Sequence, residues 1–132
     1  MKKILLFFPI FLILAGCTSK VSEEDLIGDT WKATAGYEDG EKKGGPDCYP
    51  FEEGMEFKDD DIVYIEAYER DFQYELYKDG AKIVFFDTGP NKDAKDTVSN
   101  AEFSYDIQKI DDDEITLEGR ATYEGYSCYF ER

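Results

Sequence analysis

The sequence predicts an all-β domain: an antiparallel meander of about eight strands that closes into a small up-and-down barrel, held by one disulfide. Apolar and polar residues alternate with a period of two over most of the chain after residue 30, as they do in half-buried strands. Short clusters of Gly, Asp and Pro separate these segments and favour turns. Two cysteines, Cys48 and Cys128, fall inside the predicted domain.

The chain opens with the pattern of an export signal. Met1-Lys2-Lys3 is positively charged, and residues 4–16 are almost wholly apolar. A membrane-spanning helix needs about 20 apolar residues, whereas this run is shorter and contains Pro9. We therefore predict that residues 1–16 are a signal peptide that is removed on export.

The signal ends in Leu14-Ala15-Gly16-Cys17, which resembles the lipobox of bacterial lipoproteins. The resemblance implies cleavage before Cys17, a diacylglycerol on its sulfur and a further acyl chain, such as palmitate, on the new amino terminus. Several acyl chains anchor a protein stably where one chain binds only marginally. The prediction is an extracytoplasmic, membrane-anchored lipoprotein of the cell envelope, with residues 17–25 as the lipidated tether and residues 26–132 as the barrel. The alternative is a soluble protein released by an ordinary cut.

Lipid on Cys17 would leave Cys48 and Cys128 in a compartment that permits disulfides. We predict that these two cysteines pair. In the chain-entropy model, closing a loop of this length stabilises the fold by about 4 kcal/mol. The alternative is two separate buried thiols.

One short helical turn is predicted after the polar tether. Ser22 is a suitable N-cap because Asp25 follows it three residues later. The turn would carry Leu26 and Ile27 onto the core, and Gly28 would end it. No other segment predicts a helix.

The strands follow from the period-two pattern, in which Phe72, Tyr74 and Leu76 share one face. Asp79-Gly80 favours a two-residue hairpin turn, and the three aspartates that begin at Asp111 mark another. A longer loop over residues 38–50 can fold over one mouth of the barrel, and a second covers residues 88–100. Strands are predicted near residues 31–37, 51–57, 62–68, 72–78, 82–87, 102–109, 114–118 and 121–130.

Leu26-Ile27-Gly28-Asp29-Thr30-Trp31 leads into the first of these strands, and a meander with turn glycines follows. This pattern resembles the lipocalin-like domains of bacterial surface lipoproteins over most of residues 26–132. The resemblance implies that Trp31 plugs the closed end of the barrel beneath a basic side chain from late in the chain, with Arg120 and Arg132 as candidates. The alternative is that Trp31 is an ordinary core aromatic.

The chain contains no histidine, which removes the commonest general base, the Ser-His and Cys-His nucleophile pairs and most zinc sites. Carboxylates are abundant, but none stands out as half of a catalytic pair. We predict no catalytic residue and no cofactor. The acidic runs that begin at Asp59 and Asp111 lack the glycine and terminal glutamate of an EF-hand, so exposed turns are favoured over calcium sites and no metal is predicted.

Aromatic residues are the candidate ligand contacts. Tyrosine combines a rigid apolar face with a hydroxyl that orients a ligand. The alternative is that aromatics fill the core because they favour strands. The predicted ligand-binding residues are Trp31, Tyr64, Tyr74, Tyr105 and Tyr123.

Charge limits the partners. Loss of Lys2 and Lys3 with the signal leaves 13 basic and 31 acidic residues, a formal charge of −18, and nucleic acid needs a basic footprint that this domain lacks. Anionic lipid also repels such a domain, so we expect it to stand off the membrane on its tether. The first predicted function is to hold a small apolar or amphipathic ligand in the barrel. The alternative is an acidic inhibitor or immunity-type protein that binds a cationic protein such as lysozyme.

Overall fold

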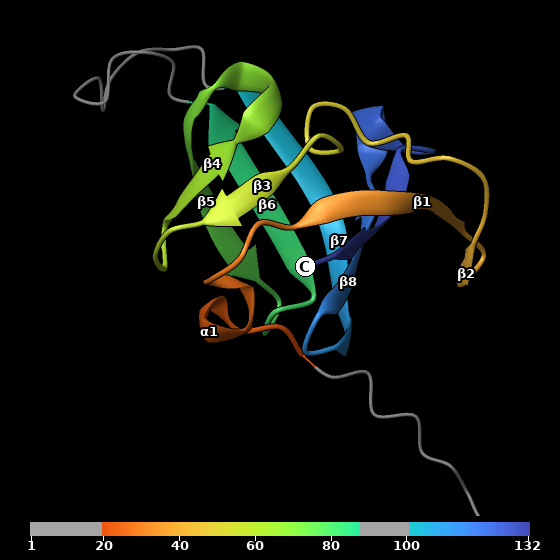
Figure 1. The fold of residues 1–132 in the computed structure, drawn as a ribbon, viewed down its shortest axis with the longest axis horizontal. Coiled ribbons are helices and arrows are strands. Elements are labelled where there is room, and N and C mark those ends of the chain that lie inside the picture. The colour runs from red at the N-terminus through yellow and green to blue at the C-terminus, as the bar shows by residue number, and fades with distance from the viewer. Residues whose placement is uncertain (1–19, 88–100) are drawn as a thin grey trace, which may run out of the picture.

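The computed structural model describes residues 20–87 and 101–132, which form one antiparallel sheet of nine strands in the order β2-β1-β9-β8-β7-β6-β5-β4-β3 (Figure 1). The signal peptide, Cys17 and the predicted loop 88–100 lie outside the described residues. No helix among the described residues is long and apolar enough to cross a bilayer. The elements are α1 (Glu23–Leu26), β1 (Lys32–Glu38), β2 (Glu41–Lys42), β3 (Met55–Phe57), β4 (Ile62–Ile65), the 3-10 helix η1 (Glu66–Tyr68), β5 (Arg70–Tyr77), β6 (Lys82–Asp87), β7 (Ala101–Asp111), β8 (Glu114–Gly119), the 3-10 helix η2 (Ala121–Tyr123) and β9 (Ser127–Glu131).

The all-β, antiparallel prediction is confirmed. Neighbouring strands in the sheet are mostly neighbours in sequence, as hairpin connections require. The described strands do not pair into a closed barrel, because β2 and β3 are the two edges of the sheet. Trp31, just before β1, and Met55 in β3 nevertheless exchange both backbone hydrogen bonds, at 2.8 and 2.9 Å. The two ends of the meander therefore meet at one isolated bridge.

Three predicted strands are shorter than expected, and one strand was missed. Residues 51–57 contribute only β3, since Phe51 and Gly54 lie in turns. Residues 62–68 end as η1, which Glu69 terminates in a left-handed conformation. Residues 121–130 begin as η2 and pair only from Ser127. The missed strand is β2, which the predicted loop 38–50 forms by folding back on β1.

The predicted helical turn is confirmed as α1. The backbone N–H and the hydroxyl of Ser22 both lie 2.9 Å from a carboxylate oxygen of Asp25, which satisfies the helix start. Leu26 is fully buried, but the prediction for Ile27 was wrong, because its side chain is 37% exposed. The helix ends at Leu26, before Gly28, and the extended backbone of Ile27 turns its side chain outward.

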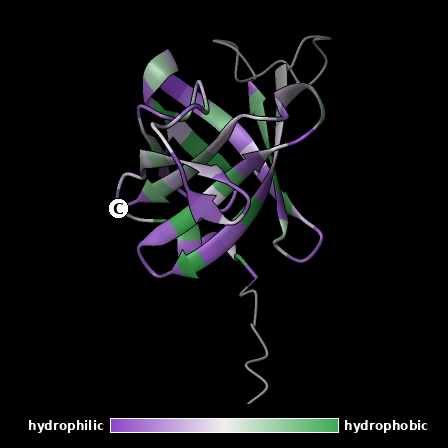
Figure 2. Cartoon of the chain, turned by 90° about the vertical axis from the view of Figure 1, so that its right-hand side faces the viewer, coloured by the Kyte–Doolittle hydropathy of each residue, from purple (hydrophilic) through white to green (hydrophobic). Residues whose placement is uncertain are grey.

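Hydrophobic and hydrophilic residues alternate along the strands (Figure 2), and the buried hydrophobic side chains fill the interior. The expected faces are confirmed on β5 and β7, where Phe72, Tyr74, Phe103 and Tyr105 are buried. The ring of Phe51 enters from the loop before β3 and makes a stacked contact with Phe85 in β6, at 4.3 Å between ring centroids. Alternation of burial fails on β6, β8 and β9, each of which buries three or more consecutive residues.

β9 is covered on both faces. Its outward-facing Ser127 and Tyr129 are buried as well as its core residues. Asp47 forms a bridge with Ser127, and the ammonium group of Lys42 lies 4.2 Å from the ring centroid of Tyr129. The predicted loop 38–50 therefore covers the outside of the sheet.

The predicted disulfide between Cys48 and Cys128 is confirmed, with the two Cα atoms 5.9 Å apart. Both cysteines are fully buried. The bond joins the segment before β3 to β9 across 80 residues of sequence. It therefore ties the loop that carries Phe51 to the far side of the sheet.

The residues from Lys20 onward belong to the folded domain. Val21 is 4% exposed, and its N–H donates to the carbonyl of Gly80 in the β5–β6 turn. The ammonium group of Lys109 lies 2.8 Å from the carboxylate of Asp25, and this ion pair holds the pKa of Asp25 below its ordinary value. The N-terminal segment is thereby attached to two separate hairpins.

Gly80 permits this attachment. Its φ of +82° is a backbone conformation that favours glycine, and a Cβ atom there would lie 1.9 Å from the carbonyl oxygen of Val21. Gly40 has the same φ, but a Cβ atom there would meet nothing within 4 Å. Both glycines have the same positive φ, but only Gly80 is in close contact with another segment. A comparison of substitutions at the two positions therefore separates the cost of the positive φ from the cost of displacing Val21.

We predict that Gly80→Ala costs more stability than Gly40→Ala. Each substitution costs about 1 kcal/mol for the positive φ, and Gly80→Ala costs more because the methyl group displaces Val21. Urea denaturation measures the difference in unfolding free energy, and hydrogen exchange at the Val21 amide reports the displacement. Equal costs with unchanged protection of Val21 would contradict the close approach.

Candidate functional site

The two ends of the sheet differ in character. At the α1 end, Trp31 is fully buried, and its indole N–H donates to the carbonyl of Leu26 at 2.9 Å. The guanidinium carbon of Arg132 lies 4.5 Å from the Trp31 ring, an arrangement that the lipocalin-like resemblance implies. The other candidate, Arg120, instead pairs with Asp106. This end is closed by packed side chains.

The opposite end carries a contiguous group of rings, here named the aromatic end. Neighbouring rings in the group have centroids 5.2 to 6.2 Å apart. Two of the rings, on β5 and β7, are buried, whereas the rings from the loops and 3-10 helices reach solvent. The aromatic end consists of Tyr49, Tyr68, Phe72, Phe103 and Tyr123.

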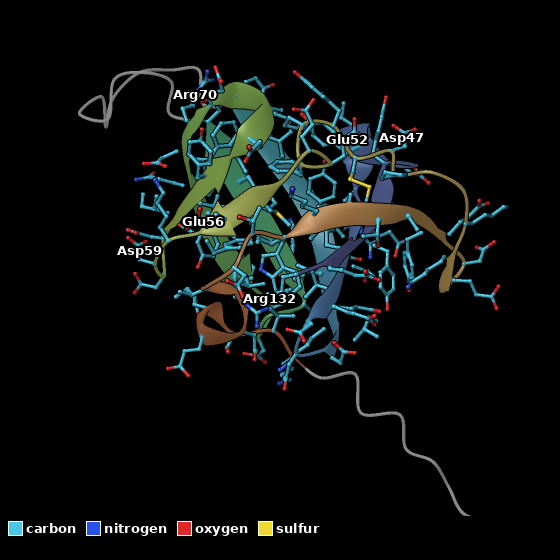
Figure 3. The ribbon with its side chains drawn as sticks, viewed as in Figure 1. Asp47, Glu52, Glu56, Asp59, Arg70 and Arg132 are labelled. Atoms are coloured by element: carbon cyan, nitrogen blue, oxygen red, sulfur yellow. A yellow bond between two sulfur atoms is a disulfide. The ribbon has the colours of Figure 1, made fainter. Side chains whose placement is uncertain are left out.

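A guanidinium group covers one side of the aromatic end. The guanidinium carbon of Arg70 lies 4.8 Å from the ring centroid of Tyr68 and 5.6 Å from that of Phe72. Both sides of its fork pair with the carboxylate of Asp87, one of them at 3.1 Å. Figure 3 places Arg70 at the opposite end of the molecule from Arg132. The paired carboxylate neutralises the arginine, so this side of the site has a polar edge with little net charge.

An unpaired hydroxyl lies beneath the aromatic end. Tyr105 is fully buried, and its hydroxyl has no hydrogen-bond partner among the described residues. Burial raises the pKa of this hydroxyl, so it keeps its proton. The ring of Tyr105 stacks against that of Tyr123, with centroids 6.0 Å apart. Native proteins pair most buried polar groups, so an unpaired one is a candidate ligand or water contact.

The predicted ligand residues do not form a single site. Tyr105 and Tyr123 lie together, beneath and within the aromatic end. Trp31 is in the plug at the α1 end, and Tyr74 is buried on β5. Tyr64 is on the outer face of β4, and its neighbours in that strand, Val63 and Ile65, are buried. The strand pattern gave no reason to distinguish these five residues, but the folded sheet places them in separate regions.

Sequence reasoning missed two members of the aromatic end that reach solvent. Tyr49 is 55% exposed and lies in the loop that follows Cys48. Tyr68 lies in η1, within a segment predicted as strand. Period-two alternation carries no signal in a loop or a 3-10 helix, so neither position was marked as a contact.

The aspartate run that begins at Asp59 caps a turn, as the exposed-turn interpretation predicts. The Asp59 carboxylate accepts the N–H groups of Asp61 and Ile62 at 3.0 and 2.8 Å, and these hydrogen bonds lower its pKa. The neighbouring carboxylate of Asp59 raises the pKa of Asp61. The hydroxyl of Tyr74 donates to the Asp59 carbonyl at 2.7 Å. The Asp59 carboxylate thus accepts hydrogen bonds from two backbone N–H groups of its own turn.

Two grooves on the outer surface have opposite charge. The basic groove, of about 360 Å³, is lined by Lys20, Lys78 and Arg120, with Asp106 as the one carboxylate among its lining residues. The acidic groove, of about 490 Å³, has Lys43 as its one cationic lining residue. The carboxylates of the acidic groove come from Glu38, Asp39, Asp47, Glu118 and Glu124.

No protein-family model, curated protein or solved structure matches this chain. The lipoprotein signal and the lipocalin-like pattern therefore remain predictions from the sequence. The functional proposal depends on the geometry of the aromatic end and on the charge of the surface.

We predict opposite stability changes for Tyr105→Phe and Tyr74→Phe. Tyr105→Phe removes an unpaired buried hydroxyl and raises the unfolding free energy by about 1 kcal/mol. Tyr74→Phe removes a hydrogen bond and lowers it by about 1 kcal/mol. Urea denaturation of both variants measures the changes. A loss of stability in Tyr105→Phe would mean that this hydroxyl has a partner in solution, such as an ordered water.

Proposed function

We propose that this chain is a lipid-anchored, extracytoplasmic binding protein with a lipocalin-like barrel, and that its aromatic end takes a small apolar or amphipathic molecule. The supporting observation is a group of five rings, three of which reach solvent, above the unpaired hydroxyl of Tyr105. Rings supply apolar contact, and a single hydroxyl supplies orientation, which together suit an amphipathic ligand.

The proposed site is at the end of the sheet because side chains occupy its interior. Phe51, Phe57, Phe85 and Tyr105 are all fully buried there. A ligand that reaches the Tyr105 hydroxyl must push aside the ring of Tyr123, which stacks on the ring of Tyr105 and would then lie along the bound ligand. Tyr123 is half-buried and belongs to a single turn of 3-10 helix, so its side chain can move without disturbing a strand.

The barrel and the absence of enzymatic activity are part of this proposal. The bridge between Trp31 and Met55 brings the ends of the meander together, and the stacking of Arg132 on Trp31 suits a plugged barrel end. The chain lacks histidine, and its two described cysteines are joined to each other. Binding without a catalytic residue, a metal or a cofactor is consistent with this composition.

We predict that a small molecule co-purifies with the gently isolated protein. Native mass spectrometry tests this and also reports the added mass of lipid on Cys17 in the same spectrum. Tyr68→Ala and Tyr123→Ala each weaken binding of that molecule, or of the neutral dye N-phenylnaphthylamine, about tenfold, because each removes a ring from the contact.

Tyr64→Ala is the matched control, because it removes the same side chain from the outer face of β4. It should leave binding unchanged. Absence of any ligand, together with unaltered dye binding in the Tyr68 and Tyr123 variants, would reject the aromatic end as the site. Lipid on Cys17 in that same spectrum would leave the anchoring proposal intact.

A second candidate function is an acidic inhibitor or immunity-type protein. The acidic groove, in which five carboxylates face one lysine, favours it. The Lys43 ammonium already pairs with Glu38 at 2.8 Å, which leaves the other four carboxylates to attract a cationic protein such as lysozyme.

This second function predicts inhibition of a lysozyme that is stronger at low salt than at high salt, since exposed charges are screened. The double substitution Glu118→Gln with Glu124→Gln should weaken that inhibition. The control, Glu23→Gln with Glu24→Gln, removes the same charge at α1. No inhibition of any lysozyme at low salt would exclude this function.

A further inference from the structure

The basic groove is an exception on an acidic molecule. The chain has 31 acidic and 15 basic residues, yet Lys20, Lys78 and Arg120 line one hollow of about 360 Å³ with a single carboxylate, Asp106. Three cationic side chains that converge on one hollow form a recognition element for an anion. A nucleic acid would need a longer basic footprint than this groove provides.

The two lysines of the groove, Lys20 and Lys78, are available to a ligand. Lys78 forms no ion pair within 4 Å in the part of the chain that the structure describes. The Lys20 ammonium lies 3.4 Å from the Asp79 carboxylate, but these side chains are 72% and 83% exposed, so water weakens their attraction. Asp106 binds Arg120 and thereby holds its guanidinium at the edge of the groove.

The groove lies beside the predicted lipid anchor. Lys20 follows Cys17 by three residues, and a chain of that length spans at most about 10 Å. Val21 is attached to Gly80, which also lines the groove. A lipid on Cys17 would therefore hold the groove close to the membrane surface. The anions that are most concentrated at that surface are phospholipid headgroups.

We propose that the basic groove holds the phosphate of an anionic phospholipid headgroup in the membrane that carries the Cys17 lipid. This inference rests on the proposed lipidation of Cys17. A second hollow adjoins the groove at Lys78 and is lined by Tyr77, Lys82 and Val84. Tyr77 is 42% exposed, and tyrosine beside lysine is typical of a membrane interface.

Binding at the groove would orient the molecule. The α1 end would rest against the bilayer, and the aromatic end would point away from it. The domain as a whole is repelled by anionic lipid, so the short connection to Cys17 is what brings these few cations within reach of the headgroups. The domain would then have a defined orientation on the membrane and would not move freely on its tether.

Energy transfer from Trp31, the single tryptophan of the chain, tests this docking. The lipidated protein is reconstituted in vesicles of equimolar phosphatidylcholine and phosphatidylglycerol that contain dansyl-labelled phosphatidylethanolamine. Because Trp31 lies at the α1 end, docking brings it close to the dansyl groups. We expect higher transfer than in vesicles without phosphatidylglycerol. Lys20→Glu with Lys78→Glu should lower the transfer to the level of phosphatidylcholine alone.

Lys43→Glu is the control, because it makes the same change of charge at the acidic groove and should leave the transfer high. Flotation of the vesicles, with full-length Cys17→Ser for comparison, reports anchoring separately. Flotation of the wild type with equal transfer in both charge variants would overturn the groove proposal and leave the anchor intact. Failure of the wild type to float would overturn the anchor and the groove together.

Discussion

The pairing of Trp31 with Met55 is the constraint on which the rest of the structure depends. A meander of antiparallel strands has two free edges, and this bridge brings the first and third strands within hydrogen-bonding distance. The buried indole then bonds to Leu26 and supports Arg132 above its ring. Trp31 therefore joins α1, the start of β1, β3 and Arg132 at the end of β9, and it closes the α1 end with packed side chains.

The disulfide has the complementary role at that opposite end. It ties the segment around Cys48 to β9, and this places Phe51 inside the sheet and Tyr49 at its rim. Aromatic side chains fill the interior. The surface that can contact a ligand in our proposal is therefore the rim of the core. The two ends then have different tasks in our proposals: the α1 end faces the lipid anchor and the basic groove, while the aromatic end is free to meet a ligand.

The candidate site was only partly predictable. Tyr105 and Tyr123 could be named from the sequence because tyrosine near a strand suits a contact surface. Their neighbours Tyr49 and Tyr68 could not, because loops and 3-10 helices place side chains without a repeating pattern. Tyr64 lies on the outer face of β4, apart from these rings. Alternation shows which residues of a strand share a face, but it does not show which face is the core.

What the sequence by itself determined is local or compositional: the all-β class, the capped turn at Ser22, and the pairing of Cys48 with Cys128, which was predicted on the expectation that lipid takes the third cysteine, Cys17. Tertiary structure decided the rest. It turned the loop after β1 into a second layer over β9, attached Val21 to the Gly80 turn, and shortened three of the predicted strands. The reason is that periodicity shows which residues of a strand share a face. Loops and termini have no such pattern, and their positions depend on contacts with residues that are distant in sequence.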